Sequence, residues 1–173
     1  MNRQIFLDMD GVIVDLHHTV AKKLNLADMT LFNRGELPMS DQDIWSGTDA
    51  EWWANLPWME DGEVIVGLCE EIVGPENVII CSKPANWPGS AEGKLLWIAR
   101  HMPSYARRFV LTPNKSWCAC SRTLLIDDNA NNALEFRQAG GASLICPRPW
   151  NVGCDEKDMA VDYLRSAIEE MLP

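Results

Sequence analysis

The chain has 173 residues, of which 47% are hydrophobic, so we expect one domain with a sizeable apolar core and exclude a disordered chain. The net charge of -10 argues against long nucleic acid or an anionic membrane as a partner, because both attract basic surfaces, but it permits a small phosphorylated ligand. No apolar run is long enough to span a bilayer, and the N-terminus leads directly into IFLDMD, which predicts no secretory signal.

The first predicted strand, residues 4–8, ends in two closely spaced aspartates, Asp8 and Asp10, with Gly11 next. Carboxylates this close repel one another, and each resists leaving water. Taken alone, DMDG between apolar runs is also typical of a hairpin turn joining two antiparallel strands. An EF-hand loop is excluded, because the glycine of that loop stands sixth and Gly11 stands fourth.

Residues 15–60 contain no convincing strand. We expect a helix over residues 16–26, then an irregular tract, then a stretch that contains four of the eight tryptophans: Trp45, Trp52, Trp53 and Trp58. A connection this long inside a compact α/β unit is usually functional. We therefore predict a small helical cap, residues 16–60, over the C-terminal edge of the sheet, and a core formed by residues 1–15 and 61–173.

The rest of the chain alternates helical patterns with short apolar runs. Further strands are predicted over residues 77–82, 108–112, 123–127 and 142–146, and helices over residues 62–73, 90–101, 130–139 and 155–172. The strand cores are continuously apolar, as expected where helices cover both faces of a parallel sheet. The alternation predicts a doubly wound α/β fold.

Three of the six cysteines are expected to be buried, reduced thiols of a cytoplasmic protein. Cys69, Cys81 and Cys146 lie in or beside apolar runs, which predicts that they are buried. Cys118 and Cys120 lack the spacing of a zinc knuckle, and no partner pair follows them.

Polar side chains follow four of the predicted strands. They are Asp8 and Asp10 after the first strand, Ser82 and Lys83 at and after the end of the second, Lys115 after the third, and Asp127 and Asp128 at the end of the fourth. Ligands of open α/β sheets bind at the carboxyl ends of the strands. If the first strand is central, Asp8 and Asp127 lie side by side.

Such a set of groups suits phosphate chemistry. Two or three carboxylates could hold Mg²⁺, which prefers oxygen ligands and would offset their repulsion. A carboxylate aimed at phosphorus can act as a nucleophile, and a second one can protonate the leaving oxygen and then activate water. A lysine and a hydroxyl can hold the phosphoryl oxygens.

The motifs DMDGVIVD, CSKP, TPNKS and LLIDDN, in that order, resemble those of the haloacid dehalogenase (HAD) superfamily of phosphatases. The closer similarity is to the 5′(3′)-deoxyribonucleotidase family, and it includes WWANLPWMEDG. The resemblance extends over residues 6–150. It implies a Rossmann-like three-layer core with a central parallel sheet of strand order 3-2-1-4-5 and a cap inserted after the first strand.

The resemblance also implies catalytic roles. Asp8 would be the nucleophile and Asp10 the general acid/base, by way of an aspartyl-phosphate. Ser82 and Lys115 would hold the phosphoryl group. Lys83 stands where family members often have a hydroxyl residue, and it either adds a phosphate contact or points to solvent.

The implied cofactor is Mg²⁺. It would be bound by Asp8, by the backbone carbonyl of Asp10 and by Asp127. Asp128 would either assist the metal through water or orient Lys115.

The implied activity is hydrolysis of nucleoside or deoxynucleoside 5′-monophosphates by a monomer or homodimer. Nucleotidases of this type tend to stack the base on an aromatic residue at the position of Leu16, so Trp45 or Trp53 could supply the stacking instead. Base, sugar and 5′ versus 3′ preference stay open. The alternatives are a phosphatase for another small ester, such as a sugar phosphate or a polynucleotide end, and a non-catalytic divalent-metal-binding module, which would require neither Asp10 nor Lys115.

Five further residues are weaker candidates for a role in the site. Lys94 is typical of a solvated helix residue, although similar nucleotidases carry a lysine there. His17 and His18 suit surface or helix-capping roles. Arg148 and Trp150, after the fifth strand, could approach the site.

Overall fold

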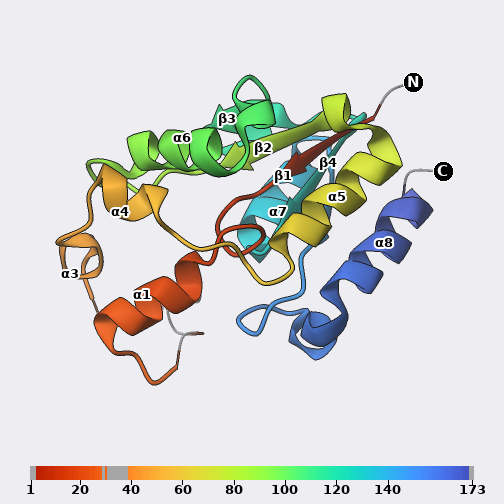
Figure 1. Ribbon diagram of the computed structural model, residues 1–173. Coiled ribbons are helices and arrows are strands. Elements are labelled where there is room, and N and C mark those ends of the chain that lie inside the picture. Colours follow the sequence, from red (N-terminus) through yellow and green to blue (C-terminus); the bar gives the residue numbers. More distant parts are fainter. Residues whose placement is uncertain (1–2, 29, 31–38, 172–173) are drawn as a thin grey trace.

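The computed structural model describes residues 3–28, 30 and 39–171. At its centre is a parallel sheet with strand order β3-β2-β1-β4-β5 (Figure 1). The strands are β1 (Gln4–Leu7), β2 (Val78–Ser82), β3 (Phe109–Leu111), β4 (Thr123–Asp127) and β5 (Ala142–Ile145). Each strand lies within its predicted range, and the order confirms the expected α/β class with β1 in the centre.

Helices cover both faces of the sheet, which gives three layers. The helices α5 (Gly62–Val73), α6 (Ser90–His101) and α8 (Ala160–Met171) pack into the larger hydrophobic cluster, and α7 (Ala130–Gln138) packs into the smaller one. Along β1, Ile5 and Leu7 belong to the larger cluster, whereas Phe6 belongs to the smaller one with Phe136 of α7. Because β1 is buried on both faces, its residues Ile5, Phe6 and Leu7 form a continuous apolar run.

The described residues also form short 3-10 helices: η1 (Pro75–Asn77), η2 (Pro103–Tyr105), η3 (Lys115–Cys118) and η4 (Cys154–Met159). The C-terminal α-helix begins at Ala160, later than predicted, because η4 occupies the residues before it. None of the η4 residues is buried, so core packing does not favour a regular α-helix there. Residue 172, the last of the predicted helix, lies outside the described residues.

The segment between β1 and α5 carries α1 (Leu16–Leu24), α3 (Asp41–Trp45) and α4 (Ala50–Ala54), which lie together to one side of the sheet (Figure 1). The α1 helix ends earlier than predicted because Asn25 adopts a left-handed conformation with φ 52°. Residues 29 and 31–38 of the predicted cap lie outside the described residues. Among the described helices, none combines the length and apolar character that crossing a membrane requires.

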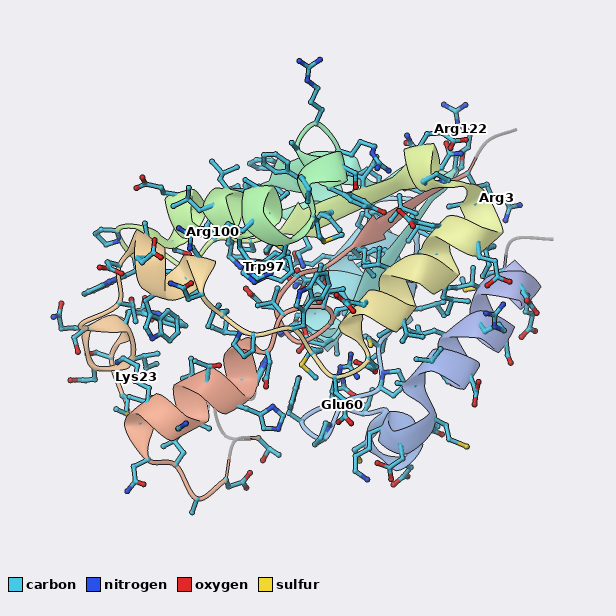
Figure 2. All side chains as sticks on the ribbon, viewed as in Figure 1. Arg3, Lys23, Glu60, Trp97, Arg100 and Arg122 are labelled. Atoms are coloured by element: carbon cyan, nitrogen blue, oxygen red, sulfur yellow. The ribbon has the colours of Figure 1, made fainter. Side chains whose placement is uncertain are left out.

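The cap helix α4 packs closely against the core helix α6. A Cβ atom at Gly93 would lie 2.3 Å from Trp53 Cβ, so a glycine is needed for this approach. Trp97 of α6 lies below that helix in Figure 2, and its indole N–H donates to Leu56 O, in the segment after α4, at 2.8 Å. These contacts hold the tryptophan-rich part of the cap firmly on the core.

Candidate functional site

Two carboxylates meet at the ends of adjacent strands. Asp8 follows β1 and Asp127 ends β4, and the register pairs Leu7 with Ile126, so the two aspartates stand level. Asp8, Asp127 and Asp128 each offer a carboxylate oxygen, and these atoms lie within 4.8 Å of one another. The expectation that Asp8 and Asp127 lie side by side is confirmed.

Lys115 lies between these two aspartates. Its Nζ is 2.6 Å from Asp8 Oδ1 and 2.6 Å from Asp127 Oδ2. The η3 turn that carries Lys115 is capped by Asn114, whose side chain accepts the Ser116 N–H. Lys115 is 3% exposed. Its ammonium group therefore compensates buried carboxylates that water cannot solvate.

The three carboxyl groups of this cluster nevertheless outnumber the one ammonium group that contacts them. Burial raises the pKa of Asp8 to about 7, against the attraction of Lys115 and with the help of the Asp127 charge. Burial, together with the charges of Asp127 and Asp8, raises the pKa of Asp128 well above its usual value. Although burial alone would lower the pKa of Lys115, the Asp127 and Asp8 carboxylates raise it. A bound cation would relieve the excess negative charge.

Asp10 is paired with a second buried lysine. Lys94 Nζ lies 2.5 Å from Asp10 Oδ2 and 5.4 Å from the centroid of the Trp53 ring. Lys94 is 1% exposed, so its interpretation as a solvated helix residue is wrong. Helical spacing could have indicated that Lys94 is buried, since it precedes the buried Trp97 and Ile98 by three and four residues and so shares their face of the helix.

Ser82 and Lys83 occupy different environments although they are neighbours in sequence. Ser82 ends β2 and is fully buried, and its Oγ has no hydrogen-bond partner among the described residues. Lys83 is exposed and lines the cavity in front of the carboxylates. The hydroxyl of Ser82 is thus buried without a partner and does not line the cavity, whereas Lys83 stands at the entrance.

A cavity of about 150 Å³ opens at the site. Its lining comprises Asp8, Asp10, Leu16, His17, Lys83, Lys115, Asp128, Asn129 and Asn132. Leu16, at the start of α1, thus faces the same cavity as the carboxylates. Trp45 and Trp53 instead belong to the hydrophobic core, where their ring centroids lie 5.1 Å apart.

His17, Arg148 and Trp150 pack around the site. Arg148 contacts the loop after β1, and Trp150 contacts the loop after β4. Arg148 Nε donates to Gly11 O at 2.6 Å, and the Trp150 indole donates to Asp128 Oδ2 at 2.6 Å. The His17 ring stacks on Trp150 with centroids 4.0 Å apart. His17 is 4% exposed, so a surface role for it is wrong, and its role in the packing of the site was missed in the sequence.

Gly11 allows the loop after β1 to approach Asp128. Its φ is +75°, which disfavours other residues, and its N–H donates to Val14 O at 2.9 Å. A Cβ atom there would lie 2.3 Å from Asp128 Oδ2. The glycine therefore serves both the turn and the compactness of the carboxylate cluster.

The donor set fits a hard divalent cation. Carboxylate oxygens are the ligands that Mg²⁺ prefers, and three buried aspartates supply them here. Burial, together with the charges of neighbouring aspartates, raises the pKa values of Asp8 and Asp128, and a cation beside them would favour their charged forms. Asp8, Asp127 and Asp128 are therefore the residues that would hold the ion.

No protein-family model matches the chain, and no curated protein matches it significantly. The arrangement of the residues themselves is therefore the basis for assigning a function.

Proposed function

We propose that this protein is a Mg²⁺-dependent phosphomonoesterase of the HAD type that hydrolyses nucleoside or deoxynucleoside 5′-monophosphates. The main support is Lys115, whose ammonium group contacts both Asp8 and Asp127 at the ends of neighbouring strands. A purely metal-binding module would not need a buried cation inside its ligand set. A site for phosphoryl groups does, because Lys115 can stabilise negative charge on phosphoryl oxygens.

In the proposed reaction, Asp8 attacks the phosphorus atom and the bond to the ester oxygen breaks. Asp10, held by Lys94, donates a proton to the departing oxygen, which leaves as an alcohol. The ionised Asp10 then takes a proton from water. That water attacks the aspartyl-phosphate, which releases inorganic phosphate and regenerates the Asp8 carboxylate.

Other groups in the site would hold the phosphoryl oxygens. The buried hydroxyl of Ser82 can donate to one of them, and Lys115 can bind another. Asp8, Asp127 and Asp128, with the backbone carbonyl of Asp10, would hold Mg²⁺. When bound, the ion supplies positive charge that draws in the phosphate and stabilises it as charge shifts.

The size of the cavity favours a second candidate, a phosphatase for a smaller ester such as a sugar phosphate. About 150 Å³ is less than the roughly 300–1,000 Å³ of common ligand pockets. A nucleoside would have to extend past the exposed Lys83 at the entrance, whereas a small ester would fit inside.

The test is a phosphate-release assay on a substrate panel with Mg²⁺, and with EDTA as the control. The panel contains 5′- and 3′-nucleoside monophosphates, their deoxy forms, sugar phosphates and an oligonucleotide with a terminal phosphate, at several pH values from mildly acidic to neutral. We expect Mg²⁺-dependent release that is fastest from 5′-monophosphates. Release from sugar phosphates alone would reject the nucleotide assignment, and no release from any ester would reject the phosphatase.

Lys94→Met is expected to lower kcat by about 100-fold with little change in KM, because general acid–base groups contribute on this scale and Asp10 loses the contact that holds it. Steady-state kinetics on the best substrate measure this, with the exposed Lys157→Met as a matched control. Lys94→Arg should recover part of the loss. Equal kcat values for the Lys94→Met and wild-type proteins would contradict the role of the pair.

A further inference from the structure

The segment that follows β5 contacts the loop after β1. Arg148 Nε donates to Gly11 O at 2.6 Å, and its Nη2 donates to Val12 O at 2.9 Å. The same guanidinium pairs with both oxygens of Asp61 at 2.7 and 2.9 Å. Arg148 therefore ties the segment to the turn that carries Asp10 and to the start of α5.

The same segment also contacts the loop after β4. Asn151 Nδ2 donates to Asp128 O at 2.9 Å and to Cys146 O at 2.8 Å. Its Oδ1 accepts the backbone N–H of Arg148 at 3.1 Å. These contacts fix the backbone of Asp128, so the loop has an attachment that does not involve any carboxylate.

Trp150 contacts the carboxylate of Asp128, whereas Asn151 contacts only its backbone. Its indole N–H donates to Asp128 Oδ2 at 2.6 Å, and Asp128 and Trp150 are each 3% exposed. The His17 ring lies parallel to the indole, with an interplanar angle of 12°. Stacking fixes the plane of the indole, and the plane fixes the direction of its N–H.

We propose that Trp150 is a positioning residue for the cation site, because its N–H holds one oxygen of Asp128 and thereby orients the carboxylate toward Asp8 and Asp127. The proposal rests on the divalent cation assigned under the proposed function. Groups that hydrogen-bond to metal-binding side chains set the orientation of those side chains, and losing one costs about 10–100-fold in metal affinity. Trp150 reaches the ion only through Asp128.

The test is binding of Mn²⁺, measured by the electron paramagnetic resonance signal of the free ion, with competition by Mg²⁺. Trp150→Phe keeps an aromatic ring for His17 and removes the N–H. We expect its Kd for Mn²⁺ to rise about tenfold. Trp87→Phe is the matched control, since it removes an indole N–H that donates to Thr48 O at 3.2 Å, and its Kd should equal that of the wild type.

A second variant separates the hydrogen bond from the fold. Trp150→3-benzothienylalanine keeps the shape of the bicyclic ring and replaces only the N–H with sulfur. It should reproduce the loss of affinity while circular dichroism stays unchanged. A Kd within about twofold of the wild type in this folded protein would overturn the proposal.

The outcomes also separate this proposal from the proposed function. A wild-type protein that binds Mn²⁺ but cleaves no ester rejects the phosphatase, while weaker Mn²⁺ binding by the Trp150 variants still supports the positioning role. A wild-type protein that binds no Mn²⁺ overturns the cation site and the positioning role together.

Discussion

Asp8→Asn is expected to abolish phosphate release, with kcat lower by at least about 10⁴-fold, which is the scale of loss when a nucleophile is removed. The amide has nearly the shape of the carboxylate but cannot form the acyl-phosphate bond. The fold should persist, because Lys115 keeps its 2.6 Å contact with Asp127. The assay is phosphate release with the best substrate under saturating Mg²⁺.

A direct readout of the nucleophile accompanies that assay. Beryllium trifluoride mimics a phosphoryl group on a carboxylate, so it should bind to wild-type Asp8 and not to the variant, as observed in a crystal. Asp158→Asn is the matched control, since it makes the same change at a side chain that is 85% exposed. Activity in Asp8→Asn comparable with this control would show that another group attacks phosphorus.

Lys115→Met is expected to destabilise the metal-free protein by about 3–5 kcal/mol, the scale of loss when a buried ion pair loses one partner. Asp8 and Asp127 would then lie buried without the ammonium group that contacts both. Urea unfolding in EDTA measures the loss. Added Mg²⁺ should restore part of the stability, because the ion supplies positive charge to the same carboxylates.

The loss of stability in Lys115→Met should depend on pH in a defined direction. The pKa of Asp8 is raised to about 7 in the folded protein, whereas an unfolded aspartate has a pKa of about 3.9. Between these values the folded state binds the extra proton, so stability falls as pH rises through this window. The deficit of Lys115→Met should therefore be smaller at about pH 5 than at about pH 7.5, because protonation replaces the missing positive charge.

The exposed lysine at the cavity entrance provides the control for this experiment. Lys83→Met removes one positive charge in a solvated position, and we expect a change within about 0.5 kcal/mol. A Lys115→Met protein as stable as Lys83→Met in EDTA would contradict the assignment of Lys115 as the compensating charge.

Local sequence pattern predicted the secondary structure of the core well. The helices over 62–73 and 90–101 begin and end at the predicted residues. The burial of Cys69, Cys81 and Cys146 also followed from the apolar runs around them. These features depend on residues close together in the chain, so periodicity and turn residues are sufficient to predict them.

The contacts that organise the site depend on residues far apart in the chain. Lys94 is 84 positions from Asp10, and Arg148 is 137 positions from Gly11. No periodic pattern links such residues, and a charged side chain in a helix is more often solvated. The cap tryptophans show the opposite case: Trp53 was a candidate for stacking on a substrate base, and it packs in the core instead.

The sequence by itself determined the strands, most helix bounds and the polar groups at the strand ends, because each is encoded within a few neighbouring residues. Only the tertiary structure decided that Lys94 pairs with Asp10 and that Trp150 holds Asp128. The physical reason is burial: a charge or an indole N–H that folding removes from water is stabilised by a partner, and that partner is whichever group the packed elements bring within reach.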